Sequence, residues 1–319
     1  MPQPPGEDTA RRLARAVLGA AGTDVYPAHP GATTGAGHFT WWAGRAHVLR
    51  CAHDADASAR LDRERAVRDL VRPHTRAAVA SSAGHGTWAA ALAYTVDTRL
   101  PGAFGDRGTV SPGGEADLAD LLGGLRAVPA AQAAMLGLPA APARPLERLR
   151  ASAVRAARAL ADEGEFGPAR FAPLGGRALA QLAAPPGGVL VHRALTGRHL
   201  GLTGDGRLGG VLHWGDAALG DPAEDIAGLA AALGAPAAVR AATLAGYGAR
   251  QCLRGLWLAR CDAVVRFAAA LRTAGADAAA GGKDGALSAL REGMWRAWEP
   301  ILLERLTGED PGDAAPAAR

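Results

Sequence analysis

The chain has 319 residues, enough for one large domain or for two lobes that each bury a core. Its net charge is only +4 and its basic and acidic residues are interspersed, so we expect no nucleic-acid partner. Cys51, Cys252 and Cys261 show no CxxC spacing, which argues against a disulfide framework and suits a cytoplasmic location. No apolar run reaches membrane length, so we expect no membrane partner.

The first part of the chain predicts a small unit with β-strands. Residues 1–8 are proline-rich and acidic, and we expect a disordered lead there. A short helix is predicted over 9–21, and a glycine-rich turn follows over 30–37. The strand-like runs 38–42 and 46–51 flank Ala-Gly-Arg and predict a hairpin.

A helix is predicted over 57–71, where apolar residues recur at helical spacing. Glu64 falls on the apolar stripe of this helix, and a buried carboxylate requires a partner. Residues 88–96 have the pattern of one or more strands. Residues 97–117 are predicted to form a loop-rich connection between two lobes.

Beyond that connection the sequence is mainly helical. A short buried strand is predicted over 188–192, and Thr203-Gly204-Asp205-Gly206 predicts a hairpin turn. Asp221, Pro222 and Glu224 have the spacing of a capped helix start. We expect further helices over 115–127, 145–163, 174–184, 237–272 and 284–305, and a disordered tail over 307–319.

Residues 188–225 carry the most informative pattern. It consists of His192-Arg193 after the predicted strand, then Leu195, then Trp214-Gly215 after the hairpin, then Gly220-Asp221-Pro222 and Asp225. In this order, the stretch resembles the aminoglycoside phosphotransferase and choline-kinase-like family, which is related to protein kinases. The spacing between positions 194 and 213 is normal for that family, and a weaker resemblance extends over roughly 10–300.

The resemblance implies an α+β, two-lobed, protein-kinase-like fold with a cleft between the lobes. A small N-terminal lobe with an antiparallel sheet is expected over 9–97, and a larger, mainly helical C-terminal lobe over 98–306. Arg50 matches the family's nucleotide-phosphate cation, and Glu64 matches its partner on the helix, so an Arg50–Glu64 ion pair is expected. The glycines of the turn, which could cover nucleotide phosphates with their N–H groups or simply form a hairpin, are Gly31, Gly35 and Gly37.

The chemistry of the family is missing from the matching positions. Ala194 stands at the catalytic Asp, His199 at the metal-binding Asn and His213 at the main metal-binding Asp. Phosphoryl transfer needs a residue that orients the nucleophile and magnesium that bridges the phosphates. Alanine can do neither, and imidazole is a poor ligand for magnesium. His192 and Arg193 are retained, but no catalytic set is intact.

We therefore predict a catalytically inactive pseudokinase that binds a small molecule, peptide or partner protein. ATP binding without magnesium stays open. One alternative is an active, ATP-dependent small-molecule kinase that uses Asp216 for its metal, and another is a purely structural subunit. His199 and His213, with His192 or Asp216, are weak candidates for binding zinc or another soft cation, and two neutral, hydrogen-bonded histidines are the preferred interpretation.

Overall fold

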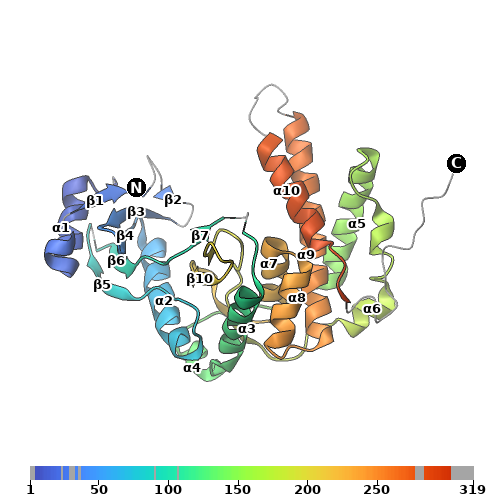
Figure 1. Ribbon diagram of the computed structural model, residues 1–319, viewed down its shortest axis with the longest axis horizontal. Helices are drawn as coiled ribbons and strands as arrows, with labels where there is room; N and C mark the ends of the chain where they lie inside the picture. Colours follow the sequence, from blue (N-terminus) through green and yellow to red (C-terminus); the bar gives the residue numbers. More distant parts are fainter. Residues whose placement is uncertain are drawn as a thin grey trace.

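The computed structural model describes residues 4–22, 24–28, 33–34, 37–89, 91–105, 108–276 and 284–302. Figure 1 shows a small sheet-containing N-terminal lobe on the left and a larger C-terminal lobe, built mainly of helices, on the right. The α+β, two-lobed arrangement expected from the sequence is therefore present. No helix in the described ranges is both long enough and apolar enough to cross a membrane.

The N-terminal lobe is an antiparallel sheet flanked by two helices. The sheet order is β1-β3-β4-β6-β5, and β2 adds to β3. Side chains alternate along β4, so Leu49 and Cys51 join the core beneath α1 while Arg50 faces α2. The elements are α1 (Glu7–Leu18), β1 (Val25–Pro27), β2 (Thr33–Thr34), β3 (His38–Ala43), β4 (His47–Ala52), α2 (Ala55–Val71), β5 (Ser82–Thr87) and β6 (Ala93–Thr98).

Strand β5 corrects the sequence-based prediction, which places strand structure only over 88–96. The pattern Ser-Ala-Gly-His-Gly-Thr has two glycines and only one residue, Thr87, of the kinds that favour strands. A Cβ at Gly84 would lie 2.7 Å from Val17, and one at Gly86 would lie 2.9 Å from Tyr94. The glycines therefore let α1 and Tyr94 approach the backbone of β5 closely.

The C-terminal lobe contains three short strand pairings and most of the helices. β7 (Ala103–Phe104) pairs with β9, β9 with β10, and β8 with β11. The other elements are α3 (Pro112–Ala127), α4 (Ala130–Met135), α5 (Leu146–Asp162), α6 (Gly176–Gln181), β8 (Val189–Val191), β9 (Leu200–Leu202), β10 (Leu208–Val211), the 3-10 turn η4 (Trp214–Asp216), β11 (Ala218–Gly220), α7 (Ala223–Leu233), α8 (Ala235–Leu244), α9 (Ala249–Ala276) and α10 (Asp284–Ala297).

Several helix boundaries differ from the predictions. The expected helix 237–272 is two helices, because the chain turns at Gly246, whose φ of 80° favours glycine. The helix predicted to run to 305 ends at Ala297, shortly before Pro300. At the other end, α1 begins at Glu7, inside the predicted disordered lead, whereas the predicted tail 307–319 lies outside the described residues.

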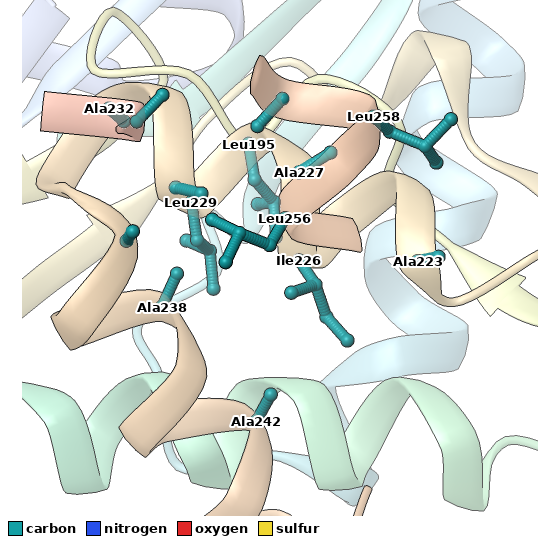
Figure 2. Packing of buried hydrophobic residues seen from close by; sticks show 14 of the residues in the cluster. Leu195, Ala223, Ile226, Ala227, Leu229, Ala232, Ala238, Ala242, Leu256 and Leu258 are labelled. Atoms are coloured by element: carbon teal, nitrogen blue, oxygen red, sulfur yellow. The ribbon is translucent and has the colours of Figure 1, made fainter. Parts of the chain in front are cut away.

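The core of the large lobe lies where α7 packs between α8 and α9 (Figure 2). Two glycines allow this packing. A Cβ at Gly255 would lie 2.7 Å from Ile226, and a Cβ at Gly228 would lie 2.8 Å from the carbonyl oxygen of Leu195. Leu195 belongs to the loop after β8, so that loop is pressed directly against the buried helix α7.

The N-terminus of α7 also holds the loop by hydrogen bonds. The Asp225 carboxylate accepts one bond from the backbone N–H of His192 at 2.8 Å and one from that of Arg193 at 2.7 Å. Arg193 has a φ of 64°, an uncommon value for a residue with a Cβ. Asp225 therefore stabilises a sharp turn of the chain immediately before Ala194.

Asp221 has two partners. Its Oδ1 accepts from the N–H of Ala223 at 3.0 Å, although α7 starts one residue later than the sequence predicts, with Pro222 rather than Asp221 at the N-cap. Its Oδ2 accepts from Nε of Arg254 on α9 at 2.6 Å, with both side chains buried. Glu224, instead of returning to the cap, pairs with Arg144 at 2.8 Å.

We predict that Asp225 makes the protein's stability fall with rising pH in one window. Burial raises the pKa of Asp225 to about 7, against about 3.9 for an aspartate in an unfolded chain. Between these values the folded state holds a proton on Asp225 that the unfolded state has released, so the contribution of Asp225 to the free energy of unfolding decreases as pH rises. Urea unfolding at several pH values should show that Asp225→Asn removes this decrease.

The control for this experiment is Asp62→Asn, because the Asp62 side chain is exposed on α2. That variant should keep the wild-type dependence on pH. The buried His192, whose pKa is lowered to about 3, acts in the opposite direction over the same range, so only the difference between the variants is decisive. Equal dependence on pH for Asp225→Asn and Asp62→Asn between pH 4 and 7 would contradict the assignment to Asp225.

Candidate functional site

The loop after β8 begins with His192, which is fully buried. Its Nδ1 accepts a hydrogen bond from the N–H of Ala194 at 3.2 Å, so its Nε2 carries the proton and donates to the Leu212 carbonyl at 3.0 Å. Burial lowers the pKa of His192 to about 3, which keeps the ring neutral. The ring also meets Trp214 edge to face, at 4.6 Å between centroids. His192 thus supports the loop and is inaccessible to a substrate.

The structure brings Ala194, His199 and His213 together. His199 Nδ1 donates to the Ala194 carbonyl at 2.7 Å. The rings of His199 and His213 stack with 4.5 Å between centroids and 11° between planes. The three positions therefore form one site, as the spacing in the sequence predicts. Burial holds the pKa of His199 below its ordinary value, which favours the neutral form in the stack.

His213 and Asp216 interact at the edge of this site. His213 has a φ of 66° and starts the η4 turn, and its Nε2 lies 3.0 Å from Oδ2 of Asp216. The Asp216 side chain is 58% exposed. The Asp216 carboxylate is therefore bonded to the His213 imidazole and remains partly open to solvent.

The stacked arrangement does not form a metal site. The lone pairs of an imidazole lie in the plane of its ring, so two nearly parallel rings cannot both point at one ion. Among the described residues, no group of three or more His, Cys, Asp or Glu side chains is arranged to hold a metal. His199, His213 and Asp216 instead form a chain of ring stacking and hydrogen bonding.

Arg50 and Glu64 form the predicted ion pair, with 2.8 Å between Nη1 and Oε2. Arg50 also donates to Asp97 from Nε and Nη2, at 3.1 and 2.7 Å. Arg68 reaches the other oxygen of Asp97 at 2.8 Å, and Thr95 donates to Asp97 at 2.9 Å. We call Arg50, Glu64, Arg68 and Asp97 the buried quartet, because their side chains are at most 12% exposed.

The quartet balances its own charges. Burial alone would raise the pKa values of Glu64 and Asp97, but the Arg50 and Arg68 cations hold both below the ordinary range. The same carboxylates raise the pKa of Arg50 against the effect of its burial. Within the described part of the chain, the guanidinium of Arg50 is engaged by two carboxylates, so little of its charge is available to a nucleotide phosphate.

Asp97 and Arg68 are missing from the predicted site. The sequence places Asp97 at the start of a loop, whereas the structure places it in β6, paired with Val48 of β4. A signal was present for Arg68. It follows Glu64 by one helical turn on the same apolar stripe, where a buried charge requires a partner.

Helix α2 links the quartet to the histidine site. Arg63, next to Glu64, has Nη2 3.5 Å from the carbonyl oxygen of Gly215 in η4, and α2 packs along this turn. Of the predicted glycine turn, Gly31 and Gly35 lie outside the described residues. Gly37 has a φ of 78°, and a Cβ there would lie 2.8 Å from Nη2 of Arg60.

We predict that Asp97→Asn lowers the free energy of unfolding by about 3–5 kcal/mol, because it leaves buried Arg50 and Arg68 without their shared carboxylate. Urea unfolding at neutral pH measures this change. Asp69→Asn is the matched control, because Asp69 pairs with Arg72 at the surface, and its loss should cost about 1 kcal/mol or less. Equal effects of the two substitutions would contradict a central role of the quartet.

We also predict that the carboxylates of the buried quartet make the folded state less stable in acid. Since the pKa values of Glu64 and Asp97 are depressed in the folded state, their contribution is complete above about pH 4 and is lost as the pH falls further. Acid titration monitored by circular dichroism should show a weaker dependence on pH below 4 for Asp97→Asn than for the wild type.

Comparison with known proteins places this site in a family. The model of the "Phosphotransferase enzyme family" matches residues 32–256, and no curated protein sequence matches the chain. The GDP complex of wild-type aminoglycoside 2'-phosphotransferase-IIIa has a TM-score of 0.60 at 16% identity, covering 92% of this chain and 98% of that chain. A macrolide 2'-phosphotransferase, MphH from Brachybacterium faecium, has a TM-score of 0.57 at 21% identity, with 89% and 98% covered.

A third structure, the streptomycin–ATP–APH(2")-IIa ternary complex, has a TM-score of 0.55 at 12% identity, with 86% of this chain and 95% of that chain covered. At these identities the structures establish the shared kinase-like fold. The family model covers most of the chain, including both the Arg50 strand and the loop of Ala194. The chain therefore belongs to the phosphotransferase enzyme family, with the kinase-like fold of the aminoglycoside phosphotransferases.

Proposed function

We propose that this protein is a pseudokinase, which uses a phosphotransferase fold to bind a small molecule, peptide or partner protein without transferring phosphate. The observation that carries the proposal is the contact between Ala194, His199 and His213. These residues stand where the family pattern has an Asp, an Asn and an Asp. The site thus keeps its shape while it lacks the oxygen ligands and the base that the reaction needs.

Two chemical requirements support this proposal. A phosphotransferase positions and deprotonates the attacking hydroxyl, which a methyl group at Ala194 cannot do. Removing a positioned base typically costs about 10²–10⁴ in rate. Magnesium prefers hard oxygen ligands, and its loss removes several kcal/mol of transition-state stabilisation in addition. Because such residues act as a unit, the two losses need not add.

The charges of the small lobe agree with this proposal. Arg50 donates to Glu64 and Asp97, so a nucleotide phosphate would compete with two carboxylates for the same guanidinium. A nucleotide in the cleft would therefore gain little from Arg50, and no carboxylate at positions 194, 199 or 213 would add a magnesium bridge. Any ATP binding should accordingly be independent of magnesium.

We predict that magnesium leaves the thermal stability of the wild-type protein with ATP unchanged, and that ATP turnover stays at background. Differential scanning fluorimetry with ATP, with and without magnesium, and detection of ADP together measure both. An increase in melting temperature that requires magnesium, accompanied by ADP formation above background, would defeat the proposal.

Restoring the family's ligands tests the same point in reverse. The double substitution His199→Asn with His213→Asp should create stabilisation by ATP that depends on magnesium, because it supplies oxygen ligands in place of two stacked rings. The matched control is His199→Ala with His213→Ala, which removes both rings without adding a carboxylate. If both double variants respond alike to magnesium and ATP, the site has been assigned to the wrong residues.

Asp216 distinguishes the second candidate, a kinase with a rewired metal site. Its carboxylate is exposed and bonded to His213, which leaves it accessible to an ion. If Asp216 held the catalytic metal, Asp216→Asn would abolish a measurable ATP turnover of the wild type. The pseudokinase proposal expects no such turnover and no change on this substitution.

A further inference from the structure

A second site is suggested by a cavity of about 310 Å³ in the C-terminal lobe. It lies at the end of β8 opposite to His192, between residues 185–188 and the turn that joins α8 to α9. Residues Ala194, His199 and His213 do not line it. The volume is at the lower end of the range for small-molecule sites, which suits a compact ligand.

Tyr247 lines this cavity with an unused polar group. The side chain is only 8% exposed, and its hydroxyl has no hydrogen-bond partner among the described residues. The hydroxyl is not among the buried side-chain atoms that lack a partner, so it is accessible to solvent or to a ligand. Burial also raises the pKa of Tyr247 to about 12, so the hydroxyl stays protonated and can donate at neutral pH.

Arg126 supplies a fixed positive charge at the same cavity. Its Nη2 donates to the carbonyl of Ala245 at 2.7 Å and its Nη1 to that of Gly246 at 3.2 Å. Its guanidinium also lies over the Tyr247 ring, 4.9 Å from the centroid. Because a guanidinium has five N–H donors, these contacts hold it in place and leave donors for a ligand.

The backbone adds further donors. Helix α9 begins at Ala249, and the first intrahelical bond runs from the N–H of Cys252 to the carbonyl of Gly248. The N–H groups before Cys252 therefore have no partner within the helix, and the positive end of the helix dipole is directed at this turn. Gly248 and Gln251 both line the cavity.

No acidic side chain opposes these donors among the described residues that line the cavity. The nearest carboxylate along the chain, Asp221 beside the lining residue Pro222, is neutralised by Arg254 at 2.6 Å. Outside the lining, the buried Asp225 carboxylate raises the pKa of Tyr247 while Arg126 opposes it, but Asp225 already accepts hydrogen bonds from the N–H groups of His192 and Arg193. The cavity therefore combines one cation, one hydroxyl and one helix N-terminus, with no carboxylate in its described lining.

We propose that this cavity binds a compact ligand through an oxyanion, either a phosphate or a carboxylate, held by Arg126, the Tyr247 hydroxyl and the first-turn N–H groups of α9. This site is independent of the pseudokinase proposal, because it uses none of the residues of the histidine site. Both kinds of oxyanion accept several hydrogen bonds at once, which matches the convergence of these donors.

Calorimetric titration with inorganic phosphate and with acetate tests the site, with chloride at matched ionic strength as the reference. Phosphate, acetate or both should bind saturably, and chloride should not. Tyr247→Phe should weaken binding about tenfold, since it removes one hydrogen bond to a charged group. It should leave the melting temperature unchanged, because the hydroxyl bonds to no described residue.

The amide hydrogens of residues 248–251 should also exchange more slowly in the presence of the bound anion.

Tyr26→Phe is the matched control. It removes the same hydroxyl group, but from an exposed tyrosine in the other lobe. It should bind the anion like the wild type. Arg126→Gln should weaken binding as well, but it also removes two bonds to the end of α8, so Tyr247→Phe decides the question. Absence of saturable binding of both anions to the wild type, or equal affinity of Tyr247→Phe and Tyr26→Phe, would overturn the proposal.

Discussion

The geometry of the histidine site depends on the two hydrogen bonds that the Asp225 carboxylate accepts from His192 and Arg193. They hold the backbone in a turn that Arg193 would not adopt readily by itself. Asp225 is in turn placed by α7, which is buried between its neighbours and pressed against Leu195. The conformation of the loop is therefore fixed by its contacts with α7 in the core of the large lobe. The contacts that hold this loop come from Asp225 and Leu195 and involve no side chain at position 194 or 213.

The small lobe shows the same separation of structure from chemistry. Arg50 sits where the resemblance implies a cation for nucleotide phosphates, yet Glu64 and Asp97 both hold it, and Arg68 balances the second carboxylate. A buried set of two cations and two anions is stable only when each member is present. The cation has thus become part of the packing between α2 and the sheet. Through Arg63 and Gly215, the same helix also supports the turn that carries His213.

Sequence reasoning identified the two lobes, most helices, the hairpin β9–β10, the Arg50–Glu64 pair and the convergence of Ala194, His199 and His213. It succeeded where a pattern has a local cause, such as the stripe of α2 or the spacing of the catalytic loop. It failed where distant packing decides. Strand β5 contains glycines because Val17 and Tyr94 approach its backbone, which no local pattern reveals. The role of Asp97 depends on the register of β6 against β4, and the stacking of the two histidine rings depends on how the loop and η4 fold together.

The stacked pair also couples two positions of the chain that lie 14 residues apart in sequence. His199 and His213 each provide the surface on which the other rests, and His199 is further tied to the Ala194 carbonyl. Exchanging one ring alone exposes the face of its neighbour without completing any set of oxygen donors. A substitution at either position therefore changes the surroundings of the other ring. Such energetic coupling means that the effects of single substitutions at 199 and 213 on stability should not add, because each one removes the same contact.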